Sequence, residues 1–354
     1  MNKINILFLG DISLNGKYID FFKRDLNPFK NLSSFFLNND LIIGNLECMA
    51  KGSEGENLLK KPRLTTTTET LNYLKKLDIG LVSLAHNHVY DHLEDGFLKT
   101  SRFLKENDIK FIGASLDKGD EAKYLIEIIN DVKFGFLNFV TKDTNPNLPK
   151  DANVYLNVFN IDDSIEQIKY LKQKVDHVIL LLHWGGRVEG SLYPDWDQPK
   201  IARKLIDAGA DVIIGHHSHT IQPYETYKGK YIFYSLGNFC FSDFSFEGKN
   251  FINPKRRRNI IIPQFSFSKT DYSVKITYWL NKGEEINSNP FYKLNMRIKN
   301  LLFLTHKIRV IWVFYFFIHR KINPIIFYLL KNDLSLYQKI KRLNLSKIKR
   351  LMKK

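Results

Sequence analysis

Oxygen and nitrogen donors follow several apolar segments of this chain, each at the point where the segment ends. They are Asp11, Asn45, Glu47, Asn87, His88, His183, His217 and His219. Carboxylate, amide and imidazole groups without thiolate suit Zn, Mn or Fe rather than Cu(I) or an iron–sulfur cluster. A carboxylate can bridge two divalent ions, and two ions about 3.5–4 Å apart clamp a phosphoryl group and acidify bound water. A nearby His can then donate a proton to a leaving oxygen. The residue types therefore indicate metal-assisted chemistry.

The pair His217 and His219 is separated by one residue. On an extended segment such a pair faces one side, so we expect both imidazoles to approach one centre. Each single Asp, Asn or His could equally cap a turn or a helix. Donors at five separate strand ends favour a shared site over five unrelated caps.

The donors need a sheet that brings strand ends together. Apolar runs that predict strands buried on both faces occur at 4–9, 40–45, 79–85, 134–139, 177–182, 210–215 and 231–238. Helix-period segments lie between them at 68–77, 96–105, 164–173 and 199–208. This alternation predicts an α/β fold. Ligands of open α/β sheets bind outside the carboxyl ends of the strands, which is where the donors lie.

Six short motifs resemble, in the same order, those of the CapA-type capsule-biosynthesis proteins, which are associated with poly-γ-glutamate capsule synthesis. The motifs are Gly10-Asp11, Gly44-Asn45-Leu46-Glu47, His86-Asn87-His88 with Asp91, His183-Trp184-Gly185, Gly215-His216-His217-Ser218-His219 and Ser235-Leu236-Gly237-Asn238-Phe239. The resemblance covers about residues 4–245. It implies a four-layer calcineurin-like metallophosphoesterase sandwich, with two stacked mixed sheets flanked by helices, over residues 1–287.

The resemblance also implies a role for each donor. It assigns Asp11, Glu47, Asn87, His183, His217 and His219 as metal ligands, with His183 and His217 on one ion and His219 on the other. Glu47 matches the bridging carboxylate. His88 matches the catalytic acid, and we place Asp11 beside it in the catalytic set. Two-metal phosphoesterases have Asp-x-His in the first motif, whereas Asp11 is followed by Ile12 and Ser13. One ligand is thus missing, and we expect one or two divalent ions (Mn, Fe or Zn).

The implied function is a metal-dependent phosphoesterase acting on a phosphorylated or polymer-precursor substrate in capsule or surface-polymer synthesis. The alternative is a non-catalytic assembly or export factor with a structural metal site. Two loops near the motifs are open to either interpretation. Lys60, Lys61 and Arg63 could bind substrate anions but fit a solvated loop better, and Arg187 and Glu189 could touch substrate.

Charge is distributed unevenly along the 354 residues. The net charge is +16, of which residues 290–354 contribute +15 with 16 Lys and Arg and a single acid, Asp333. The body is therefore nearly neutral and the tail is basic.

Cys48 and Cys240 are too few for a disulfide framework or a four-cysteine zinc site. The first residues lack a signal-peptide pattern, so we expect a cytoplasmic protein.

The tail, residues 290–354, is expected to be helical, with two apolar runs at 310–318 and 325–330. Each run is shorter than the ~20 residues that span a bilayer. Basic residues beside Trp and Phe also suit peripheral contact of residues 300–330 with anionic lipid on the inner membrane face. The alternative is that the runs pack on the domain. Nucleic acid is not expected as a partner, because the dispersed stacking pattern of a strand-binding groove is missing.

Overall fold

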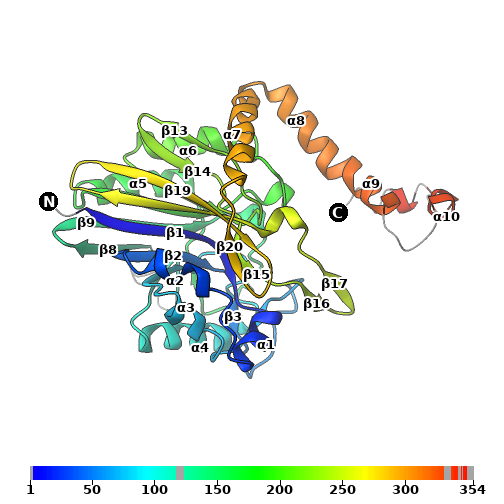
Figure 1. The fold of residues 1–354 in the computed structure, drawn as a ribbon, viewed down its shortest axis with the longest axis horizontal. Helices are drawn as coiled ribbons and strands as arrows, with labels where there is room; N and C mark the ends of the chain where they lie inside the picture. Colours follow the sequence, from blue (N-terminus) through cyan, green and yellow to red (C-terminus); the bar gives the residue numbers. More distant parts are fainter. Residues whose placement is uncertain (1–2, 117–122, 331–335, 342–343, 345, 349–354) are drawn as a thin grey trace.

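The computed structural model describes residues 3–116, 123–330, 336–341, 344 and 346–348. Within these residues two mixed β-sheets pack face to face, and helices cover the outer face of each (Figure 1). The predicted α/β class and the layered arrangement of two stacked sheets flanked by helices are confirmed.

The first sheet is built around the N-terminal strand. Its order is β20 (Ile286–Ser288), β19 (Tyr272–Asn281), β18 (Asn259–Phe267), β1 (Ile4–Ser13), β2 (Leu41–Leu46), β5 (Leu81–Ser83) and β6 (Lys110–Ile112), with β15 (Asn238–Phe241) also paired to β1. β1 is parallel to β2 and β15 and antiparallel to β18. The register places Asp11 beside both Asn45 and Asn238.

The second sheet carries the histidine-bearing strands. Its order is β13 (Tyr224–Tyr227), β14 (Lys230–Phe233), β12 (Val212–His216), β11 (His177–His183), β9 (Val132–Val140) and β8 (Tyr124–Ile129). β11 is buried along its whole length, as its continuous apolar run predicts. β11 and β12 are parallel, and their register pairs His183 with His216 at the ends of the two strands.

Three apolar clusters hold the layers together. Ile6, Phe8, Phe136, Leu181 and Phe265 belong to the cluster between the sheets. The outer face of the first sheet packs on α1 (Lys17–Lys23), α2 (Ser33–Phe36), α3 (Asn72–Lys76) and α4 (Leu93–Glu106). The outer face of the second sheet packs on α5 (Ile161–Lys172) and α6 (Gln198–Asp207). α3 to α6 are the four helices that the sequence periodicity predicts, with ends shifted by a few residues.

Short paired strands decorate the loops: β3 (Met49–Ala50) with β4 (Thr65–Thr66), β7 (Ala114–Ser115) with β10 (Tyr155–Leu156), and β16 (Phe244–Phe246) with β17 (Lys249–Phe251). The β16–β17 hairpin projects beyond the sheets (Figure 1).

The C-terminal segment is helical where the structure describes it. It contains α7 (Tyr292–Phe303), α8 (Arg309–Phe317), α9 (Asn323–Leu330) and α10 (Leu336–Lys341). No single described helix is long and apolar enough to cross a membrane, but 292–307 and 309–326 together pass by length and composition, with a bend of 115° between them. Residues 331–335, which include Asp333, and residues 342–343, 345 and 349–354 of the predicted tail lie outside the described residues. The division after residue 287 stays a prediction.

Gly10 lets two backbones meet directly beside the site. A Cβ at Gly10 would lie 2.0 Å from the Gly237 carbonyl oxygen, which accepts a hydrogen bond from Asp11 N at 2.8 Å. Neither backbone can move without opening the sheet. Gly10→Ala should therefore lower the free energy of unfolding by about 1–3 kcal/mol. Thermal unfolding would measure the loss. The control is Gly229→Asn, since nothing lies within 4 Å of a Cβ there and Asn tolerates its positive φ. An unchanged melting temperature for Gly10→Ala would contradict this account.

Candidate metal centre

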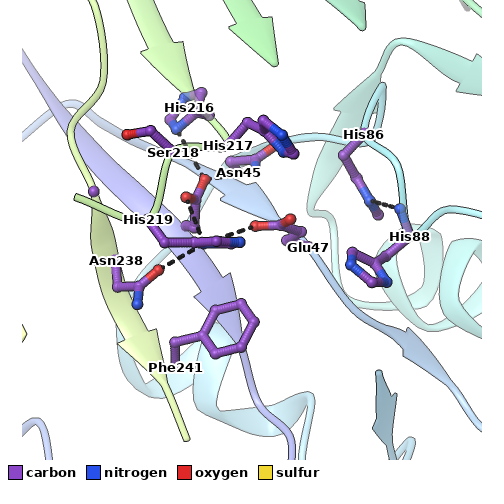
Figure 2. Close-up of polar contacts among 12 residues, drawn as sticks. Asn45, Glu47, His86, His88, His216, His217, Ser218, His219, Asn238 and Phe241 are labelled. Atoms are coloured by element: carbon purple, nitrogen blue, oxygen red, sulfur yellow. Dashed lines mark hydrogen bonds and ion pairs between the residues drawn. The ribbon is translucent and has the colours of Figure 1, made fainter. Parts of the chain in front are cut away.

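The carboxyl ends of strands from both sheets meet at one buried centre. Asp11 comes from β1, Glu47 follows β2, Asn87 follows β5, His183 ends β11, and His217 and His219 follow β12. All six predicted ligands are therefore brought together, and each is buried. His88 lies beside them (Figure 2).

The first group of donors is Glu47, His183 and His217, whose candidate ligand atoms all lie within 4.8 Å of one another. His183 Nε2 lies 3.1 Å from His217 Nδ1 and 3.6 Å from Glu47 Oε1. Asn87 Oδ1 lies 2.9 Å from the same His183 nitrogen. One nitrogen thus faces an imidazole, an amide and a carboxylate at once.

The second group is Asp11, Glu47 and His219, again within 4.8 Å. His219 Nδ1 lies 3.3 Å from Asp11 Oδ2 and 3.7 Å from Glu47 Oε2. Asn238 Oδ1 lies 2.9 Å from the same nitrogen, and Figure 2 shows the His219 ring between Asn238 and Glu47. Glu47 belongs to both groups, because its Oε1 faces the first group and its Oε2 faces the second.

His217 and His219 approach the same buried centre, but the prediction that they do so from an extended segment is wrong. Both residues have positive φ, 87° and 57°, in a bend that follows β12. The bend directs the two rings, whose centroids are 6.1 Å apart, into different groups. This division agrees with the one that the family resemblance implies.

Two buried oxygens show that the donors suit a cation. Asp11 Oδ2 and Glu47 Oε2 have no hydrogen-bond partner although both residues are fully buried. A buried carboxylate oxygen without a partner costs free energy unless a cation compensates it. The residues therefore fit one or two divalent ions, whose identity the donor set leaves among Mn, Fe and Zn.

The Asn87 amide can take two orientations with different consequences. With Oδ1 toward His183 it offers an oxygen to the first group. In the reversed orientation its nitrogen would donate to Glu47 Oε1 at 3.1 Å, and its oxygen would accept from Lys60 Nζ at 3.0 Å. The first orientation suits a bound cation, because an oxygen then faces other acceptors.

Burial and mutual charge perturb the pKa values of Glu47, Asp11 and His219. Burial raises the pKa of Glu47 well above its usual range, although His219 opposes the shift. Burial acts to raise the pKa of Asp11 too, but contacts with His216 and His219 bring it well below its usual range. Burial acts to lower the pKa of His219, whereas Glu47 and Asp11 raise it to about 9. Positive charge is thus favoured between the two carboxylates.

The sequence interpretation missed two neighbours of the donors. His216 Nδ1 lies 3.4 Å from Asp11 Oδ1. Asn238 fixes the His219 ring. The extra His of Gly215-His216-His217 and the Gly237-Asn238 turn were the available signals. Asn45 is not a member of either group, because it donates to Asp11 Oδ1 at 2.9 Å and so orients that carboxylate.

His88 is supported from behind by a buried acid. Its Nδ1 lies 2.7 Å from Asp91 Oδ2, which also accepts from Leu64 N at 2.6 Å. When Asp91 is ionised it only accepts, so it accepts the hydrogen on Nδ1 and favours a second proton on Nε2, although burial lowers the pKa of His88 well below its usual range. Burial raises the pKa of Asp91 to about 7.

A pocket of about 520 Å³ opens onto this centre. His88, His217 and His219 line its floor. Its walls combine cations with apolar rings, from Lys60, Lys61, Arg257, Phe241, Phe244 and Phe251. The pocket is therefore suited to an anionic group that carries an apolar part.

The structure separates the loop residues whose role the sequence did not decide into those that line the pocket and those that do not. Lys60 is buried in the pocket wall, where its Nζ donates to the Asn145 carbonyl at 3.0 Å. Arg63 pairs with Glu56 away from the pocket. Glu189 lines the pocket and pairs with Arg257 at 3.2 Å. Arg187 instead forms a two-bond pair with Asp197.

Comparison with known proteins finds relatives with capsule-related names. Residues 5–243 match the family model described as "Bacterial capsule synthesis protein PGA_cap". The capsule biosynthesis protein CapA of Bacillus anthracis is 29% identical over 258 residues, covering 68% of this chain and 60% of the relative. The PGA biosynthesis protein CapA of Bacillus subtilis is 30% identical over 249 residues, covering 66% and 62%. The chain thus spans about three fifths of the length of these relatives.

Solved structures with a similar arrangement are more distant. The NAD nucleotidase of Haemophilus influenzae gives a TM-score of 0.45 at 14% identity, covering 85% of this chain and 62% of that one. A 5'-nucleotidase precursor from Thermus thermophilus gives 0.42 at 14% identity, covering 87% and 59%.

Proposed function

Because this chain belongs to the bacterial capsule synthesis protein family PGA_cap, we propose that it is a metal-dependent phosphoesterase of capsule or poly-γ-glutamate-type polymer synthesis. The single observation that carries the catalytic part is the pair of donor groups that share Glu47, of which His217 and His219 line the pocket. A site that was only structural would have no need of an open pocket on its donors.

The proposed ligands are those of the two donor groups. Glu47, His183, His217 and Asn87 would hold one ion, and Asp11, Glu47 and His219 would hold the other. A divalent ion there would supply positive charge for the phosphoryl oxygens and acidify water. Asp11 takes its place in the catalytic set as a ligand, with Asn45 and His216 fixing its Oδ1.

His88 is the proposed proton donor to the leaving oxygen. Its ring lines the pocket next to Asn87, and Asp91 accepts from Nδ1–H, which stabilises the doubly protonated ring whose Nε2–H would go to the leaving oxygen. Lys60 is the proposed contact for a substrate anion, since its ammonium group lies in the same wall. The apolar rings of Phe241, Phe244 and Phe251 would contact the leaving group. The substrate is therefore proposed to be a phosphorylated polymer precursor.

The second candidate function is a non-catalytic assembly or export factor with a structural metal site. The observation in its favour is the first motif, where Ile12 and Ser13 follow Asp11 and the expected His ligand is missing. The second group then has three donors within 4.8 Å. Such a reduced group could hold an ion for stability alone.

A substrate screen separates the two functions. The purified full chain, supplied with Mn²⁺ or Zn²⁺, is expected to hydrolyse at least one class among phosphomonoesters and phosphodiesters, including lipid-linked phosphates. Released phosphate or alcohol is measured, with a metal-chelated sample as the control. Metal bound at full occupancy with no turnover on any ester would contradict the phosphoesterase and favour the assembly factor. Location in the cytoplasm stays a prediction that cell fractionation can test.

A further inference from the structure

The segment of residues 291–326, called the arm below, leaves the sheet layers and extends beyond them (Figure 1). One side of the arm packs on the body. Met296 joins the cluster between the sheets, and Phe303, Trp312 and Phe316 join the outer cluster of the second sheet. The base of the arm therefore has a fixed position.

The other side of the arm is apolar and exposed. Fourteen of the 25 exposed large apolar side chains among the described residues lie between 291 and 326. Leu301, Val310 and Phe314 are 67%, 77% and 62% exposed. Scattered surface apolar residues are ordinary, but a concentration of this kind marks an interaction surface.

The charges on the arm are all of one sign. Residues 290–330 contain no Asp or Glu. Lys293, Arg297, Lys307, Arg309 and Arg320 are exposed bases on the same segment. An apolar surface bordered by bases is complementary to a bilayer whose lipid headgroups are anionic.

We propose that the arm is a docking surface for an anionic phospholipid bilayer, in whose interface its helices lie. A second copy of the chain fits less well, because it would place bases against bases. A straight span fits less well too, because no single described helix is long and apolar enough to cross a membrane and the segments 292–307 and 309–326 meet at a bend of 115°. The surface begins at Phe291, nine residues before the segment 300–330 that the sequence suggested.

Docking would also orient the pocket. α8 contacts the loop that follows Glu189, since the Tyr315 hydroxyl accepts from Leu192 N at 3.1 Å and Trp312 packs on Tyr193 with ring centroids 5.0 Å apart. Glu189 lines the pocket. The arm therefore connects the lipid surface to the pocket wall, which suits a substrate carried on lipid. The inference of a lipid-carried substrate rests on the proposed function, whereas the inference of membrane binding does not.

Vesicle flotation of the full chain tests the proposal. Protein is mixed with vesicles of phosphatidylglycerol and phosphatidylcholine, or of phosphatidylcholine alone, and bound protein is measured across a salt series. We expect binding to the anionic vesicles that weakens as salt rises, because a Debye length is ~10 Å at 0.1 M. The double variant Val310→Asp with Phe314→Asp should reduce binding by at least about tenfold, since two apolar side chains that would be buried in the bilayer are replaced by charged ones.

The matched control places the same two charges elsewhere. Leu37 and Ile128 are 78% and 63% exposed on the body, and Leu37→Asp with Ile128→Asp should float as the parent does. Circular dichroism and bound-metal content confirm folding of each variant. The proposal is overturned if the parent stays unbound at low salt, or if both double variants lose binding equally. Light scattering that shows a dimer abolished by the Val310 and Phe314 changes would also overturn it.

Discussion

Glu47→Gln is expected to abolish metal binding and phosphoesterase activity together. Glu47 is the only described residue that belongs to both donor groups, with Oε1 toward His183 and Oε2 toward His219. Gln keeps the shape but loses the charge that a cation between these residues needs. Replacing groups that merely orient a ligand already costs 10–100-fold in metal affinity, so a bridging ligand should cost more than about 100-fold. Elemental analysis of purified protein measures the loss.

Single-group variants give this experiment its internal comparison. His217→Ala removes a donor from the first group and His219→Ala one from the second. If two ions bind, each of these variants should retain the ion of the other group, whereas Glu47→Gln should retain neither. His306→Gln is the control, because His306 contacts Arg203 and the Phe303 carbonyl and lies apart from the donors. Unchanged metal content in both Glu47→Gln and His217→Ala would overturn the assignment.

The sequence was a good guide to the strands that are buried on both faces. β1, β2, β5, β9, β11, β12 and β14 each overlap a predicted apolar run. The long β18–β19 hairpin was missed, although its strands contribute Phe265 and Tyr278 to the cluster between the sheets. Polar residues alternate with apolar ones along β19, so it lacks the continuous apolar run by which the other strands were predicted. The place of the hairpin in the first sheet depends on the pairing of β18 with β1, which is about 260 residues away.

The donor set was predictable for a physical reason. Parallel strands deliver their carboxyl ends to one edge, so donors that follow such strands converge even when they are far apart in sequence. The supporting contacts depend on how the two sheets pack, which no local pattern encodes. His216 reaches Asp11 from the other sheet. The rings of His217 and His219 diverge because both residues have positive φ. A positive φ is unfavourable for a residue that carries a Cβ, so the local sequence does not predict it.

Loss of the His88 imidazole should remove the proposed proton donor while the ions stay bound. His88 is in neither donor group, yet it lines the pocket beside Asn87. A positioned general acid contributes about 10²–10⁴-fold, so His88→Ala should lower kcat/KM by that factor on the ester found in the screen. Esters with a good leaving group should be affected least, because they need no proton. Metal content should equal that of the parent.

Asp91 provides the test of how His88 is held. Asp91→Asn keeps an oxygen that can still accept from His88 Nδ1 and Leu64 N, but it removes the negative charge behind the ring. Activity should therefore fall less than in His88→Ala, and the double variant should be no worse than His88→Ala, because the two residues act as one unit. His92→Gln is the control, since this buried His contacts Leu64 and Thr65 and does not line the pocket. Full activity in His88→Ala, or an equal loss in His92→Gln, would show that the reaction does not use the His88 proton.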